Sequence, residues 1–256
     1  VQNADTYYIK VSRSGGGPSD FDFTALFDIR PILSSVTSGS IIINDDTSGF
    51  PAIVMDRTTG VVLGVLTQIP GGETAAIFET GESIWHRTGF PFDISVFDTT
   101  LSLVVNGIND HSVNEAGLAR SDTDFYFFYG NAIDKITKAG VVTTTALGTA
   151  IPQANIKGVA VSADGTVLYY ITGGNIASAF CDGRIKRWDL VNNIAMSDLY
   201  AIPGFVNADG DQMAMTGNNN DNGNLLRLAD GTFVTHSYDG SSDLFSILHI
   251  SAAGTL

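Results

Sequence analysis

Residues 158–202 read GVAVSADGTVLYYITGGNIASAFCDGRIKRWDLVNNIAMSDLYAI, and this stretch decides the fold. It holds four short apolar runs, each closed by a turn that contains Gly or Asn. Apolar runs of this length between such turns are typical of antiparallel β-strands. The turns ADG at 163–165 and VNN at 191–193 are of the kind that accepts a positive φ in a hairpin. The stretch therefore predicts one four-stranded antiparallel sheet.

The same pattern recurs along the chain. An apolar residue followed by a polar turn and a second β-run occurs at six anchor positions, which are Val11, Met55, Phe97, Ile136, Trp188 and Ile250. Consecutive anchors lie 44, 42, 39, 52 and 62 residues apart. A four-stranded repeat of about 40–45 residues has the length of a propeller blade. We therefore predict an all-β chain, a β-propeller of about six four-stranded antiparallel blades.

The repeat is incomplete at its two ends. The first hairpin, YYIKVSRS at 7–14 with FDFTALFDI at 21–29, supplies only two strands, the outer pair of a blade. After the last anchor, Leu256 is reached where a fourth strand is due. We expect a single propeller domain over residues 1–256 that is incomplete at both ends and is a segment of a longer polypeptide. An irregular final strand is the alternative explanation.

Composition limits the classes of partner and compartment. The formal net charge is −14, and the 13 Lys and Arg residues are scattered, so the chain offers no basic stripe for nucleic acid. Cys181 is the only cysteine, which excludes an intrachain disulfide. No apolar run approaches the roughly 18 residues of a membrane span, and we expect no membrane insertion. The few charges and the many Ser, Thr, Asn and Gly residues favour an extracellular, cell-surface or virion protein.

Residues 158–190 carry a family resemblance. The pattern GVAVSADGTVLYYITGG followed by GRIKRWDL resembles a blade of the propeller superfamily that includes NHL-type, strictosidine-synthase-like, SMP-30/gluconolactonase-like and YncE-like repeats. In the lactonase-like branch, a Glu and Asn or Asp side chains from different blades hold a metal on the central axis. This sequence does not match that set residue by residue. The resemblance therefore implies an architecture and leaves the activity open.

Propeller geometry assigns the connections to two faces. Turns between the first and second strands and between the third and fourth strands share one face, here called the short-turn face; they read ADG, RTTG, KAG and AAG. The remaining connections share the opposite, long-loop face, and they include long polar segments at 44–51, 106–117, 173–183 and 203–224. Long loops on a rigid scaffold are where binding usually resides. We predict a binding surface on the long-loop face.

The candidate site residues are polar or charged side chains in or beside those loops. The predicted binding residues are Asp45, Asp46, His86, Arg87, His111, Asp182, Asn218, Asp221, His236, Asp239 and Asp243. A second set places oxygen ligands at alternate positions, a pattern that suits Ca²⁺, and comprises Asn207, Asp209 and Asp211. The alternative for this set is that Asn, Asp and Gly cap their own turns. We assign no catalytic residue and no cofactor, with Ca²⁺ as the alternative.

Two classes of function remain. The first is a non-enzymatic recognition or scaffold module that binds a glycan, another protein or copies of itself in an assembly. The second is a propeller hydrolase or lactonase with a divalent cation bound by its loops. An enzyme needs carboxylates and His from several blades around the axis, whereas the acidic candidate residues in the loops here concentrate in the last two blades. This distribution favours binding over catalysis.

Overall fold

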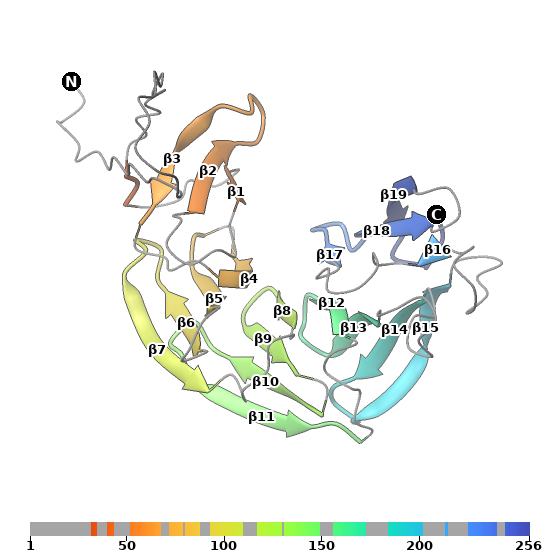
Figure 1. Ribbon diagram of the computed structural model, residues 1–256. Helices are drawn as coiled ribbons and strands as arrows, with labels where there is room; N and C mark the ends of the chain where they lie inside the picture. Colours follow the sequence, from red (N-terminus) through yellow and green to blue (C-terminus); the bar gives the residue numbers. More distant parts are fainter. Residues whose placement is uncertain are drawn as a thin grey trace, which may run out of the picture.

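The chain is all-β in the part that the computed structural model describes. That part comprises residues 32–34, 40–43, 52–67, 72–78, 80–87, 93–109, 117–129, 131–148, 156–172, 184–201, 213–214, 225–239 and 244–256. These residues form five antiparallel sheets that follow one another along an open arc, and no helix occurs among them (Figure 1). The arrangement is that of a β-propeller, as predicted.

Each sheet is one blade, and the blades are numbered in chain order. Blade 1 contains β1 (Ser40–Ile43), β2 (Ala52–Asp56) and β3 (Val62–Leu66). Blade 2 contains β4 (Gly72–Ile77), β5 (Ser83–Arg87), β6 (Asp93–Phe97) and β7 (Leu103–Asn109). Blade 3 contains β8 (Gly117–Arg120), β9 (Phe125–Phe128), β10 (Ala132–Ile136) and β11 (Val142–Ala146). Blade 4 contains β12 (Ile156–Val161), β13 (Val167–Thr172), β14 (Arg184–Asp189) and β15 (Ile194–Ala201). Blade 5 contains β16 (Met213–Ala214), β17 (Leu226–Arg227), β18 (Phe233–Asp239) and β19 (Leu244–Ile250).

Blades 2, 3 and 4 are simple meanders in which sequential strands are neighbours. Their first strands lie on the inner side of the arc and their last strands form its outer rim (Figure 1). The stretch at 158–202 forms blade 4, as predicted. Both of its predicted turns contain a residue with positive φ, Gly165 at 74° and Asn193 at 56°. The two hairpin turns predicted for this blade are therefore confirmed.

The two end blades differ from the meander. In blade 5, β16 and β17 pair with opposite ends of the same strand, because Met213 lies opposite Asp239 and Leu226 lies opposite Val234. The loop predicted at 203–224 thus contains a short strand that the sequence analysis missed. In blade 1, Ile32 forms a parallel bridge with Val65 of β3. Five blades are described, and the hairpin predicted at 7–29 lies outside the described residues.

The core formed by the described residues is divided into four apolar clusters, one for each pair of neighbouring blades. All four residues of β9 are buried, and they alternate between the two neighbouring clusters. Phe125 and Phe127 join the cluster shared with blade 2, whereas Tyr126 and Phe128 join the cluster shared with blade 4. Burial of one such side chain stabilises the fold by about 1.5–3 kcal/mol. The aromatic run at 125–128 therefore packs between blades.

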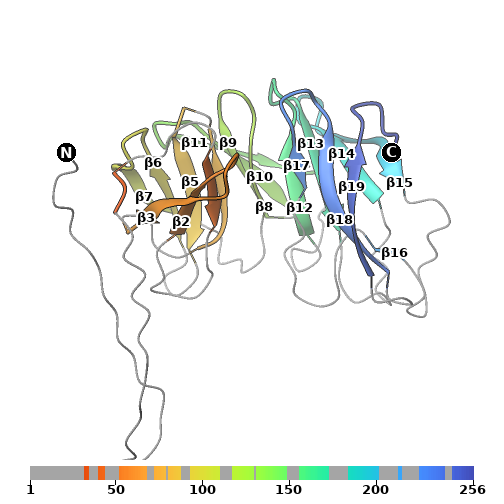
Figure 2. The same ribbon diagram turned by 90° about the horizontal axis from the view of Figure 1, so that it is seen from above.

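The two faces of the propeller are separated in space. Viewed edge-on, the tight turns of blades 2 to 5 lie along the upper edge of the arc (Figure 2). Strands β5, β7, β13, β15 and β18 end at the opposite edge, where the longer connections begin. Within the described residues, no helix is long and apolar enough to cross a membrane.

Candidate functional site

The short-turn face is built from carboxylates that bind their own turns. In five turns an Asp side chain accepts a hydrogen bond from a backbone N–H two or three residues later; these residues are Asp56, Asp98, Asp164, Asp189 and Asp230. In four of the turns a Thr hydroxyl donates to the same carboxylate oxygen. Side-chain bonds of this type fix a tight turn locally. These five carboxylates therefore stabilise the turns in which they lie.

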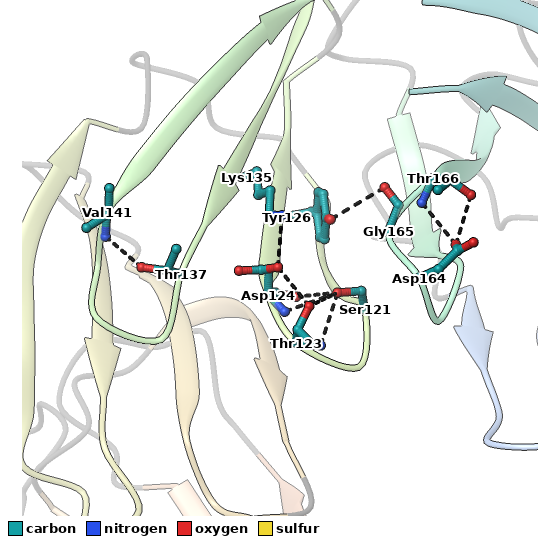
Figure 3. Close-up of polar contacts among 10 residues, drawn as sticks. All are labelled: Ser121, Thr123, Asp124, Tyr126, Lys135, Thr137, Val141, Asp164, Gly165 and Thr166. Atoms are coloured by element: carbon teal, nitrogen blue, oxygen red, sulfur yellow. Dashed lines mark hydrogen bonds and ion pairs between the residues drawn. The ribbon is translucent and has the colours of Figure 1, made fainter. Parts of the chain in front are cut away.

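These hydrogen bonds lower the pKa of the five carboxyl groups, because they favour the charged form. For Asp98, the hydroxyl of Thr100 lowers the pKa most, followed by the backbone N–H groups of Ser102 and Thr100. The bonds are 2.7, 3.0 and 2.8 Å long, respectively. For Asp164, the hydroxyl of Ser162 lowers the pKa most. Figure 3 shows the Asp164 carboxylate facing Thr166 across its turn.

Acid sensitivity follows from these turns. A carboxyl group whose pKa is lowered by folding stabilises the protein fully above its unfolded pKa of about 4, and this contribution is lost as the pH falls through the folded pKa. We expect the melting temperature to fall as the pH drops from about 5 to about 2. Asp98→Ala should make this fall shallower, as measured by circular dichroism melts at a series of pH values. Asp122→Ala is the control, since Asp122 is exposed on the same face. It should keep the wild-type dependence of melting temperature on pH. Equal dependence in all three proteins would contradict the assignment.

Turns of the short-turn face also join neighbouring blades. The backbone N–H of Asp122 in blade 3 donates to the carbonyl of Ala163 in blade 4 at 2.9 Å. The Tyr126 hydroxyl lies 3.5 Å from the carbonyl oxygen of Gly165, and Figure 3 shows the two turns side by side. Between blades 3 and 2, the Lys138 ammonium lies 3.0 Å from the Glu82 carboxylate. The same ammonium lies 4.0 Å from the centre of the Phe78 ring. The short-turn face thus holds the blades together.

His86 is the predicted site residue whose side chain the structure describes. It is the penultimate residue of β5, and the residue is 1% exposed. The imidazole lies 5.6 Å from the ring of Phe127 in blade 3, measured between centroids. The alternation along β5 explains this position: Trp85 packs towards blade 1, and Ile84 and His86 point towards blade 3. The ring therefore sits between blades, below the surface of the long-loop face.

The other predicted site residues are placed only in part. Arg87 and Asp239 are the last residues of β5 and β18, so both lie at the edge from which long loops leave. His236 lies in β18, opposite Ile247 of β19. The remaining candidates fall outside the described residues; they are Asp45, Asp46, His111, Asp182, Asn207, Asp209, Asp211, Asn218, Asp221 and Asp243. In the described part of the chain, no three His, Cys, Asp or Glu side chains gather as ligands for a metal ion.

A buried polar group in blade 3 was not predicted from the sequence. Asp134 of β10 is 1% exposed and accepts a hydrogen bond of 2.5 Å from the hydroxyl of Thr144 on β11. Tyr129, which follows β9 at the long-loop edge, stacks 5.7 Å from Phe127. The pKa of Tyr129 is raised to about 12. Burial is the largest cause, followed by the charge of Asp134 and a hydrogen bond to its carboxylate. The Tyr129 hydroxyl therefore stays neutral at physiological pH and serves as a hydrogen-bonding group.

Comparisons with known proteins add little to this geometry. No family model and no curated protein match the sequence. Solved structures with a similar chain trace include "KlHsv2 with loop 6CD replaced by a Gly-Ser linker", at 12% identity and a TM-score of 0.49, over 84% of this chain and 69% of that one. A second is a virginiamycin B lyase from Staphylococcus aureus, at 13% identity and a TM-score of 0.45, over 86% and 72% of the two chains. A third is the dihydro-heme d1 dehydrogenase NirN, at 12% identity and a TM-score of 0.47, over 90% of this chain and 47% of that one. At these scores the likeness carries no argument about activity, and the class that the fold itself defines is the β-propeller.

Proposed function

We propose that this propeller is a non-enzymatic recognition or scaffold module of an extracellular, cell-surface or virion protein. It binds a glycan or another protein through its long-loop face. One observation carries the proposal: the carboxylates of the opposite face are engaged in their own turns and its backbone joins the blades, so that face is structural. The connections that vary in length and composition leave the other edge. Ligand-specific chemistry therefore belongs on the long-loop face.

The competing proposal is a propeller hydrolase or lactonase. It is motivated by the alternation of Asn207, Asp209 and Asp211, whose side-chain oxygens suit a hard cation such as Ca²⁺. The resemblance of residues 158–190 to SMP-30/gluconolactonase-like repeats points in the same direction. Against it stands the distribution of the acidic candidate residues, most of which lie in blades 4 and 5, since a reaction on the propeller axis draws on several blades.

One experiment separates the two proposals. The full chain is applied to a printed glycan array and, in parallel, to an aliphatic lactone whose hydrolysis is followed by pH-stat. Recognition predicts binding to one class of glycan and no hydrolysis. Hydrolysis that is abolished by EDTA and by Asp209→Ala would establish the enzyme instead. Absence of binding to every glycan would restrict the first proposal to a protein partner.

Matched variants test the assignment of the face. Asp182→Asn combined with Asp221→Asn removes two charges from predicted long loops, and we expect about a tenfold or greater loss of affinity for the bound glycan, as for contacts near the centre of an interface. Asp122→Asn is the control, because it removes a charge from an exposed position on the short-turn face. Affinity should stay at the wild-type value in the control. A loss of affinity in the control, with none in the loop variant, would place the site on the short-turn face and contradict the assignment.

A further inference from the structure

We propose that the two ends of the arc are binding surfaces for residues 7–29 of this same chain, which fill a sixth blade position between them. This inference does not depend on the proposed function. It starts from sheet faces in blades 1 and 5 that have no neighbouring blade among the described residues.

The outward face of blade 5 carries exposed apolar side chains beside two histidines, His236 and His249. Leu226 and His249 both lie opposite Val234, so the three side chains share one face, and Ile247 lies two residues from His249 on the same face. Ile247 is 81% exposed and Leu226 is 56% exposed. The other face of the same sheet packs against blade 4 through buried side chains that include Phe233, Leu248 and Ile250. Among the described residues, blade 5 is thus packed on one side only.

The outward face of blade 1 has the same character. Ile41 lies opposite Met55, and Ile53 lies opposite Val65, which places four aliphatic side chains on one face. Ile41 is 47% exposed. The opposite face packs Ala52, Val54 and Leu66 against blade 2. The described residues therefore cover this end of the arc on one side only as well.

Blade 3 is a comparison for a sheet that has neighbouring blades on both of its faces. Every residue of its strand β9 is buried, because blades 2 and 4 pack on its two sides. In blade 5, Phe233 and Thr235 of the corresponding strand are buried and Val234 between them is only half-buried. Blades 1 and 5 stand at the two ends of the arc with the gap between them (Figure 1). Exposed apolar side chains that share a sheet face in this way mark an interaction site.

The segment that precedes blade 1 in the chain has the sequence of a further hairpin. Residues 7–29 read YYIKVSRSGGGPSDFDFTALFDI, which is the pattern of a hairpin with five aromatic side chains. The segment leads directly into Ile32 and Leu33, which bind the outer strand of blade 1: the backbone N–H of Leu33 donates to the carbonyl of Val65 at 2.9 Å. The segment is therefore joined to one wall of the gap. Its alternating apolar residues match the apolar faces on both sides.

Thiol reactivity tests the proposal. In a full chain that carries Cys181→Ser, a single reporter thiol is introduced by Ile247→Cys on the outward face of blade 5. The control reporter is Val191→Cys, at a turn residue of blade 4 that is 72% exposed. We expect the reporter at 247 to react with a disulfide reagent at least about tenfold more slowly than the reporter at 191, because a covered thiol reacts only after local opening. Equal rates would overturn the proposal.

A second comparison identifies what covers the face. Removal of residues 1–31 should raise the rate at 247 by about tenfold or more and leave the rate at 191 unchanged. Replacement of Phe21, Phe23 and Phe27 with Ser in the full chain should do the same, which keeps the test valid where the truncated chain fails to fold. The native mass, measured by light scattering, should be that of a monomer. A dimer in which dilution exposes the thiol at 247 would identify a second copy as the occupant and refute the proposal.

Discussion

Phe127→Ala is expected to lower the free energy of unfolding by about 3–5 kcal/mol, the cost of deleting a large side chain from a packed core. Phe127 is fully buried in the cluster that joins blades 2 and 3. Its ring lies 5.6 Å from that of His86 and 5.7 Å from that of Tyr129. Each side of Phe127 is a hydrogen-bonded sheet, so we expect the vacated volume to be filled only in part. The resulting cavity adds to the lost transfer free energy.

Chemical denaturation followed by tryptophan fluorescence measures this loss. Val142→Ala is the control, because Val142 lies on the outer strand of the same blade and is 38% exposed. A surface change of this type shifts stability by less than about 0.5 kcal/mol. A loss below about 1 kcal/mol for Phe127→Ala would contradict the inter-blade core described above.

The second large effect is expected for Gly140→Ala. Gly140 closes the β10–β11 turn with φ of 80°, and a Cβ there would collide with the side chain of Val105 on β7 of blade 2. Positive φ costs a non-glycine residue about 1–2 kcal/mol, and forced overpacking costs about 1–3 kcal/mol. We expect a total loss of about 2–5 kcal/mol if the two costs add.

Gly60→Ala is a matched control for this contact. Gly60 closes the equivalent β2–β3 turn with φ of 69°, but a Cβ there would have no atom within 4 Å. Its replacement should cost only the backbone term, about 1–2 kcal/mol. The difference between the two variants, measured by denaturant unfolding, reports the contact between blades. Equal losses would show that the turn of blade 3 does not press on blade 2.

The turns were the most predictable part of this fold, because their conformation depends on the residues within them. Gly165 and Asn193 adopt positive φ through their own chemistry, and the Asp98 and Asp230 carboxylates bind N–H groups only a few residues away. Repetition of such turns at blade-like intervals was sufficient to predict the propeller. The pattern needed no knowledge of distant contacts.

Features that depend on distant contacts were missed. Strand β16 lies within a predicted loop, since it exists only through pairing with Tyr238 and Asp239 at the far end of β18. Asp134 has the sequence pattern of an exposed strand residue, yet it lies buried beside Thr144. His86 was expected at the binding face, and its position between blades follows from which side of β5 faces blade 3. The predicted loop carboxylates lie outside the described residues and stay predictions.

Hydrogen–deuterium exchange of the full chain, with and without the glycan that it binds on the array, tests the central claim most directly. Recognition through the long-loop face predicts slower exchange in peptides that cover residues 173–183 and 203–224. Peptides that cover the turns at 98–102, 137–141 and 228–232 should exchange at the same rate in both states. Protection confined to those turns would place the ligand on the short-turn face and contradict the account.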